Sequence, residues 1–431
     1  MKKKKLALHW KIILGIVLGI LLGIALIQFD WGKQLVVDWI KPFGTIFVNM
    51  LKLIAIPLII VSLVKGVADL KDISQLSKMG LRTFMLYIVT TVLAISTGLV
   101  LVNIIKPGTF ISEDTRVEML GSFGGDVENR LSDAQQTVTQ SGPLQPLVDV
   151  VPENIFGAAS SNANMLQVIF FAILVGVGLV MLPEEKSAPI IKLFDSGNEL
   201  MLKIVDIIMM IAPYGVFALM TSLIAESPSA DIFVALGAYG MTVLLGLIVM
   251  TYGMYGLLLK FFGGINPFDF QKKMAPAQLV AFSTSSSAAT LPVTMERVEE
   301  HIGVDKEVSS FVLPIGATMN MDGTSVYQGI AAVFIAQVFG QDLTLTQQLT
   351  ILLTATLASI GTAAVPGAGL LMLVIVLESI GVNPAGIALI LAVDRPLDMC
   401  RTVTNVTGDA TVAVIINKLT GRRLKPTATD D

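Results

Sequence analysis

Polar and charged side chains gather in the segment 394–409, DRPLDMCRTVTNVTGD, between the apolar stretches GIALILAV and ATVAVII. Spacings of 4, 3, 4 and 4 residues, which place side chains on one helix face, separate Asp394, Asp398, Arg401, Asn405 and Asp409. A guanidinium can hold a carboxylate through two hydrogen bonds, and a carboxylate attracts an ammonium. Because Asp398 lies three residues before Arg401 on this face, the segment brings an acidic and a basic group close together.

Two further aspartates, Asp322 and Asp409, each lie beside a glycine in the related motifs NMDGT and NVTGD, and neither has a cation close in sequence. Unwinding of the helix at such a motif would expose backbone carbonyls, and pockets of carboxylate, carbonyl and hydroxyl oxygen suit a hard cation such as Na⁺. We therefore expect both helices to be interrupted there. The alternative to a cation site is a set of internal ion pairs that only hold helices together. Such pairs would account for Asp394 and Arg395, but they account poorly for Asp322 and Asp409.

The elements that must position these side chains are predicted to lie in a membrane. Of 431 residues, 54% are hydrophobic and 14% are charged, against about 25% charged in soluble proteins. A membrane-spanning helix needs about 20 apolar residues, and such runs lie at 12–27, 84–105, 165–182, 204–224, 232–262 and 326–339. An ionised side chain at mid-membrane costs about 2.5–3.5 kcal/mol, so the charges must face protein, water or a ligand.

Basic residues are segregated along the chain. Lysines and arginines occur at 2–5, 65–82, 260–273 and 418–425, whereas 226–231, 340–346 and 378–386 contain none. By the positive-inside rule both termini are predicted to be cytoplasmic, in a multi-pass protein of the plasma (inner) membrane. A cleaved signal peptide is disfavoured because no small-x-small site follows the first apolar run. The single cysteine, Cys400, excludes an intramolecular disulfide.

Two regions cannot be simple spans. The first, 275–301, has a hydroxyl-rich centre, and the second, 344–381, is broken at SIGTAAVPGAG. The half after that break would form about 18 Å of helix against a hydrocarbon core of about 30 Å. Their tips, SAATLP and TAAVP, resemble each other, although one serine tract alone could be an ordinary loop. The predicted fold is an all-α polytopic membrane protein with eight transmembrane helices and two oppositely oriented re-entrant helical hairpins in inverted repeats.

The motifs SSSAATLP, NMDGT, SIGTAAVPGAG and DMCRTVTNVTGD resemble those of the dicarboxylate/amino acid:cation symporters, the sodium-coupled glutamate and aspartate transporters. The resemblance covers nearly the whole chain. It implies secondary active transport rather than enzyme activity, namely sodium-coupled uptake of aspartate or glutamate by alternating access. A symporter of C4-dicarboxylates or of neutral amino acids remains the alternative within the family. It further implies a homotrimer embedded in lipid, with no nucleic acid partner.

The resemblance also assigns substrate contacts. Arg401 would hold the side-chain carboxylate of the substrate and Asp398 its ammonium, while Val365 and Gly369 would close over it. The α-carboxylate and amine would be served by Ser285, Ser287, Thr324, Thr402 and Asn405.

Three sodium sites are implied in the same way, with Met321 coupling them to the substrate. One comprises Asp409 with carbonyls of Gly316, Asn320 and Asn405. The second comprises Thr318, Ser359, Ile360 and Thr362. The third comprises Tyr87, Thr90, Thr91, Asn320 and Asp322.

In family members a transport domain slides against a trimeric scaffold. Applied to this chain, the resemblance implies that scaffold helices 1 and 2 lie within 1–78 and that helix 3 of the transport domain lies within 79–106. A flexible external loop would follow at 107–149, and scaffold helices 4 and 5 would lie within 150–225. The remaining transport domain, 226–431, holds helix 6, hairpin 1 at about 268–301, helix 7 at about 306–339, hairpin 2 at about 344–381 and helix 8 at about 384–418.

Departures from the family pattern are few. Ala288 and Ala364 replace a common serine and glycine, and an arginine stands at Arg395 instead of on the first tip. Relatives that also carry a proton have a glutamate four residues after the threonine of NMDGT, where this chain has Gln328. We therefore expect sodium coupling without an obligatory proton. Two other classes of protein are disfavoured. The chain has no GxGD motif, which an intramembrane aspartyl protease would need, and two arginines beside the second aspartate would disturb a shared-proton pair. An ion channel would not need an aspartate and an arginine at the spacing of Asp398 and Arg401.

Overall fold

The computed structural model describes residues 8–68, 78–113, 115–116, 151–160, 164–226, 231–360 and 368–426. Every regular element in these ranges is a helix, which confirms the predicted all-α class. The expected tip TAAVP, with Thr362 and Val365, and most of the expected loop at 107–149 lie outside the described residues. The start of that loop, η2 (Pro107–Phe110), packs against α12 and α17, and the Gly108 amide donates to Gln337 Oε1 at 3.1 Å.

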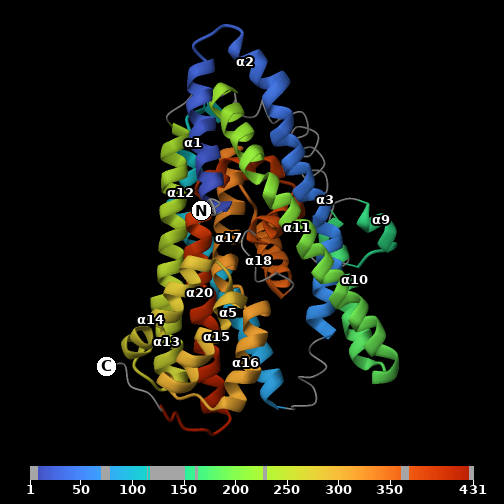
Figure 1. Cartoon of the computed structure of the whole chain (residues 1–431), viewed down its shortest axis with the longest axis vertical. Helices are drawn as coiled ribbons and strands as arrows, with labels where there is room; N and C mark the ends of the chain where they lie inside the picture. The colour runs from blue at the N-terminus through green and yellow to red at the C-terminus, as the bar shows by residue number, and fades with distance from the viewer. Residues whose placement is uncertain are drawn as a thin grey trace, which may run out of the picture.

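One group of helices is built around α3 and α11, which lie side by side in Figure 1. Gly15 and Gly19 on α1 face α11 so closely that a Cβ would clash with the carbonyls of Pro213 and Phe217. Small residues at four-residue spacing are typical of such close approach between membrane helices. The group consists of α1 (Leu8–Leu26), α2 (Gly32–Leu35), η1 (Val36–Ile40), α3 (Lys41–Ala68), α9 (Ile155–Ala159), α10 (Met165–Met181) and α11 (Glu184–Glu226).

A second group packs around α17 and α20. Sixteen of the residues from Asp322 to Val338 in α17 are buried, so this helix forms the centre of the group. The other members of the group are α5 (Lys78–Ile105), α12 (Asp231–Ile248), η4 (Val249–Met254), α13 (Tyr255–Leu258), η5 (Leu259–Gly263), α14 (Pro267–Thr284), α15 (Ser287–Glu296), η6 (Arg297–Ile302), α16 (Lys306–Met319), α18 (Leu345–Ile360), α19 (Ala368–Ser379), η7 (Pro384–Gly386) and α20 (Ile387–Leu419).

Two pairs of consecutive helices fold back on themselves. Helices α14 and α15 pack against each other and reverse direction at Ser285, which adopts the left-handed conformation with φ 52°, and Ser286. The Ser286 hydroxyl accepts a hydrogen bond from the Ala289 amide at 3.2 Å and so caps α15. Helices α18 and α19 also pack against each other. Each predicted hairpin therefore contains two helices that pack together, and its re-entrant course stays a prediction.

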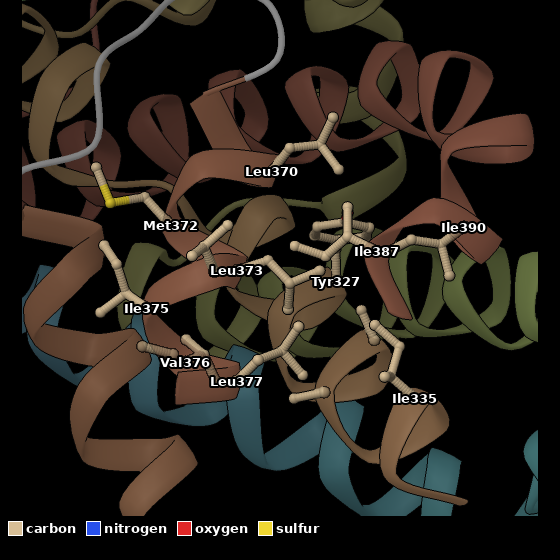
Figure 2. Close-up of a cluster of buried hydrophobic side chains, with 14 of the residues drawn as sticks. Tyr327, Ile335, Leu370, Met372, Leu373, Ile375, Val376, Leu377, Ile387 and Ile390 are labelled. Atoms are coloured by element: carbon tan, nitrogen blue, oxygen red, sulfur yellow. The ribbon is translucent and has the colours of Figure 1, made fainter. Parts of the chain in front are cut away.

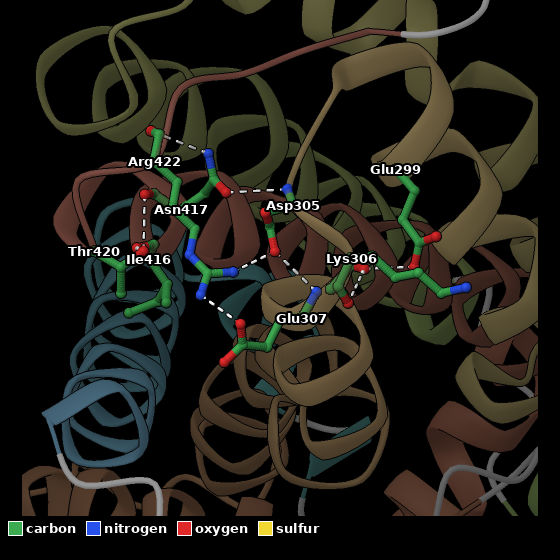
Figure 3. A network of polar contacts seen from close by, with 9 residues as sticks. Glu299, Asp305, Lys306, Glu307, Ile416, Asn417, Thr420 and Arg422 are labelled. Atoms are coloured by element: carbon green, nitrogen blue, oxygen red, sulfur yellow. Dashed lines mark hydrogen bonds and ion pairs between the residues drawn. The ribbon is translucent and has the colours of Figure 1, made fainter.

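The bases of the two helix pairs meet opposite ends of α5. Near the start of α5, Arg82 donates to the Leu419 carbonyl at 2.8 Å. The chain just beyond Leu419 is bound to the base of the first pair, because Arg422 forms ion pairs with Asp305 and Glu307 (Figure 3). Near the end of α5, Asn103 donates to Gln348 Oε1 at 2.9 Å, at the start of α18. The opposite orientation of the two pairs stays a prediction.

The predicted break at NMDGT is confirmed, and the one at NVTGD is wrong. Helix α16 ends at Met319 and α17 begins at Asp322, with Asn320 in a non-helical conformation (φ −104°, ψ 88°). Helix α20 instead runs through 405–409 without interruption. Its Gly408 serves close packing, because a Cβ there would clash with the Tyr255 hydroxyl and lie 2.8 Å from Asn320 Nδ2.

Three helical runs of the described chain are long and apolar enough to cross a bilayer: Gly32–Ala68, Met79–Phe110 and Asp231–Gly263. A fourth is added if Glu184–Val205 and Met210–Ala225, which meet at 47°, form one bent span. These runs indicate an integral membrane protein. The exact number of eight spans stays a prediction.

Candidate functional site

Arg401 on α20 is the centre of a buried ionic cluster. Its relative exposure is 0%, and its Nη2 donates to Asp398 Oδ1 at 2.8 Å and lies 3.0 Å from Asp394 Oδ1. The second contact is an ion pair without hydrogen-bond geometry, since Asp394 Oδ1 accepts no hydrogen bond from the described residues. Below the guanidinium lies the ring of Tyr327, with its centroid 3.8 Å from Cζ.

Two donors of Arg401, Nε and Nη1, have no hydrogen-bond partner within the described part of the chain. A Cβ added to Gly369 would lie 3.5 Å from Nη1 and 3.1 Å from Thr324 Cγ2. Helix α19 therefore brings its backbone close to both residues, and a glycine keeps that approach free. A buried guanidinium with unpaired donors is suited to bind a carboxylate.

The neighbouring residues of α20 face the same centre. Asp398 also accepts from Arg395 Nη1 at 3.0 Å, so it lies between two arginines. The Thr402 hydroxyl donates to the Asp398 carbonyl at 2.9 Å. Asn405 Oδ1 accepts from the Gly323 amide at 2.7 Å. Together with the Asp409 contact described below, these bonds confirm the prediction that the spaced residues occupy one face of a helix.

The first helix pair contributes its tip. Ser285 and Ser287 are buried, and the Ser285 hydroxyl has no partner among the described residues. Both α14 and α15 pack against α20, and Gln278 Nε2 donates to the Thr407 hydroxyl at 3.0 Å. A left-handed serine at a buried tip is an unusual conformation, of the kind that concentrates at functional sites.

Two buried carboxylates, Asp322 of α17 and Asp409 of α20, lie beside the break between α16 and α17. Asn320 Nδ2 donates to Asp409 Oδ1 at 3.0 Å, and the Thr90 hydroxyl contacts Asn320 Oδ1 at 3.3 Å. A Cβ on Gly316 would clash with both the Tyr87 hydroxyl and the Asp409 carboxylate. Residues predicted for two of the cation sites, which come from α5, α16 and α20, therefore meet around Asn320.

Asp322 completes this oxygen-rich region. Its Oδ1 accepts from the Thr91 hydroxyl at 2.9 Å and its Oδ2 from the Tyr255 hydroxyl at 2.7 Å. Asp322 is 0% exposed and Asp409 2% exposed, and in the described structure neither forms an ion pair with a lysine or arginine. Unpaired buried carboxylates are costly. The donor set of carboxylate, amide and hydroxyl oxygens fits a small hard cation.

Sequence reasoning missed Tyr255 and Tyr327. Neither lies in a motif with recognisable chemistry, and only tertiary packing separates Tyr255 from the exposed Tyr252 three residues earlier. Tyr327, next to Gln328 in α17, lies in an apolar stretch where nothing in the sequence predicts a contact with Arg401.

The remaining predicted residues are less closely connected. Met321 Sδ receives a hydrogen bond from Asn405 Nδ2 at 3.3 Å. Of the expected second cation site, Ser359 is buried with no partner for its hydroxyl among the described residues, whereas Thr318 is exposed and bonds to the Ile315 carbonyl at 3.0 Å. Ile360 ends α18, and Thr362 lies outside the described ranges.

Buried charged and oxygen-bearing side chains that meet at a helix break inside an all-helical membrane protein are typical of secondary transporters. The chain belongs to the sodium:dicarboxylate symporter family, whose model matches residues 8–419.

Three relatives illustrate the match. The proton/sodium-glutamate symport protein of Geobacillus stearothermophilus is 34% identical over 419 residues, covering 97% of this chain and 96% of the relative. The proton/glutamate-aspartate symporter of Escherichia coli is 34% identical, covering 97% and 94%. Mouse excitatory amino acid transporter 3 is 39% identical over 421 residues, covering 89% of this chain and 79% of the relative.

Proposed function

We propose that this protein is a sodium-coupled symporter of an acidic amino acid, aspartate or glutamate. The observation that carries the proposal is Arg401. It is fully buried, its Nη2 is held by Asp394 and Asp398, and its Nε and Nη1 have no partner in the described structure. Such a group binds the distal carboxylate of the substrate. Relatives are named for glutamate and aspartate, which agrees with this chemistry.

Asp398 receives the ammonium of the substrate. Its two oxygens already face Arg401 and Arg395 at 2.8 and 3.0 Å, so the site holds alternating charges within two turns of α20. Gly369 lies beside Nη1 of Arg401 and beside Thr324, and both residues are proposed to contact the carbon skeleton of the substrate. The α-carboxylate is bound by the tip of the first hairpin, with Ser285 and Ser287, and by Asn405 and Thr402. Val365 closes the site from the second hairpin.

Sodium ions are co-substrates bound near Asn320. Asp322 and Asp409 supply two negative charges without a basic partner in the described structure, and Thr90, Thr91 and Tyr87 supply neutral oxygens. Three sodium sites follow the pattern of the family. Because Met321 and Asn405 lie between Asp409 and the substrate residues, ion binding and substrate binding share one set of side chains.

The coupling ion is sodium without an obligatory proton. Gln328 is buried in α17 and cannot bind a proton at neutral pH. The bacterial relatives carry proton in their names, so this chain is proposed to differ from them in its coupling.

Transport proceeds by alternating access, with α5, α12 and the helices from α14 to α20 moving as a transport domain against a trimeric scaffold of α1, α3, α10 and α11. The separate packing of these two groups supports the division. Both helix pairs are proposed to be re-entrant and to enter from opposite sides, because their bases meet opposite ends of α5. We propose that the end with Arg82 and Arg422 faces the cytoplasm and that both chain termini are cytoplasmic, as the positive-inside rule predicts.

Uptake of labelled aspartate into proteoliposomes tests the function. An inward sodium gradient should drive uptake, and potassium or choline in its place should not. Excess glutamate should compete, whereas serine and succinate should not at equal concentration. Dominant competition by serine or by succinate would replace the proposal with a neutral amino acid or a C4-dicarboxylate symporter. Aspartate uptake that ignored the sodium gradient would refute sodium coupling.

A further inference from the structure

We propose that Tyr327 is a specificity-determining residue, whose ring fixes the orientation of Arg401 and thereby makes the site prefer an acidic to a neutral amino acid. The inference rests on the proposed function and deepens it. It starts from the stacking of two buried side chains, Arg401 of α20 over Tyr327 of α17, with 3.8 Å between Cζ and the ring centroid. Both residues have a relative exposure of 0%.

The ring contributes what the aspartates cannot. Asp394 and Asp398 both contact Nη2 of Arg401, so together they hold one corner of the guanidinium. Contacts at one corner leave the plane of the group free to rotate about that corner. A ring lying flat beneath the guanidinium removes this freedom. With the plane fixed, Nη1 stays on the side where Gly369 approaches.

The ring of Tyr327 is itself held firmly. Figure 2 shows it among apolar side chains of α19 and α20, with Leu373 and Ile387 beside it. Its hydroxyl has no hydrogen-bond partner in the described part of the molecule. The aromatic face contacts Arg401, so we expect the ring rather than the hydroxyl to hold the guanidinium.

A neutral amino acid places no charge beside Arg401, so the orientation of the guanidinium matters only for an acidic substrate. A desolvated cation–π contact is worth about 2 kcal/mol, which corresponds to about a 30-fold change in a dissociation constant. Loss of the ring should therefore weaken aspartate binding by about 30-fold and leave serine binding unchanged. A ring that only filled the core would affect both substrates equally.

The experiment compares Tyr327→Leu and Tyr327→Met, which remove the ring, with Tyr327→Phe, which keeps it. The matched control is Phe334→Leu, which removes a buried ring seven residues further along the same helix, stacked on Tyr239 at 4.7 Å. Dissociation constants for aspartate and serine are measured by calorimetry at saturating sodium on the purified full-length protein. We expect the aspartate-to-serine ratio of constants to rise about 30-fold in the ring-free variants and to stay near wild type in the other two.

A second arm uses the Arg401→Thr background, in which serine should bind well. Removal of the ring there should leave serine affinity unchanged, because no guanidinium remains to be oriented. The inference is overturned if the aspartate-to-serine ratio of dissociation constants is unchanged in both Tyr327→Leu and Tyr327→Met, or if these variants weaken the binding of both substrates equally. It is also overturned if Tyr327→Phe changes the ratio as much as the two ring-free variants do. Failure of the proposed function is separate: wild-type protein would then not bind aspartate with sodium at all.

Discussion

Replacement of Arg401 by threonine should convert an acidic amino acid site into a neutral one. The guanidinium contacts two buried carboxylates, with Nη2 at 2.8 Å from Asp398 and 3.0 Å from Asp394. Without it, a substrate carboxylate would be desolvated with no partner and would face Asp394 and Asp398 directly. Serine places no charge there and suffers neither penalty.

The magnitude follows from the burial of the group. Truncation of one partner of a buried charge pair costs about 2–5 kcal/mol, so aspartate binding should weaken by about 30-fold or more. Because Arg401 is the cation within reach of Asp394 in the described structure, the variant also leaves that carboxylate without its ion pair. Some loss of thermal stability is therefore expected together with the change in specificity.

The assay is competition by aspartate, glutamate, serine and alanine for sodium-driven uptake in proteoliposomes. The matched control is Arg395→Thr, which removes the same charge from the other side of Asp398 at 3.0 Å. Arg395 is less buried than Arg401, with 17% of its side chain accessible against 1%, so its loss should change the aspartate-to-serine preference less than the loss of Arg401. Retention of wild-type aspartate preference in Arg401→Thr would refute the assignment, and so would an equal effect of the two variants.

Three further variants test the cation region and the coupling. Gln328→Glu should make sodium-driven uptake respond to a proton gradient, because a buried carboxyl can bind a proton and an amide cannot; a wild-type protein that already responds would contradict sodium-only coupling. Tyr255→Phe removes the 2.7 Å hydrogen bond to Asp322, worth about 1.5–3 kcal/mol for a charged acceptor. The melting temperature should fall more without sodium than with it, and an equal fall would show that Asp322 does not bind the ion. Gly408→Ala should cost about 1–3 kcal/mol of stability by overpacking, because its Cβ would clash with the Tyr255 hydroxyl. Gly237→Ala, with open space around its Cβ, is the control and should leave the melting temperature unchanged.

Local patterns in the sequence were sufficient to predict the all-α class of fold and the residues of the ionic cluster around Arg401. Apolar runs specify helices because every backbone group in a bilayer must be hydrogen-bonded within its own segment. The spacing of Asp394, Asp398 and Arg401 specifies one face of a helix, whatever that helix packs against. The same local reasoning predicted helix breaks at NMDGT and at NVTGD, and only the first is present.

Other features depended on packing between segments far apart in sequence. The motif NVTGD resembles NMDGT, yet α20 stays helical there because Gly408 gives room to the Tyr255 hydroxyl from α13 and to Asn320 from the α16–α17 break. The same glycine pattern therefore has two structural outcomes, chosen by neighbours rather than by propensity.

By itself, the sequence determined that the helices lie in a membrane and which charged residues must face the interior, because these properties follow from the cost of exposing polar groups to lipid. Only the tertiary structure decided which atoms meet. It placed Tyr327 beneath Arg401 and Tyr255 beside Asp322, contacts that join residues 74 and 67 positions apart. Such contacts depend on the relative rotation and shift of packed helices, which the periodicity of each single helix leaves open.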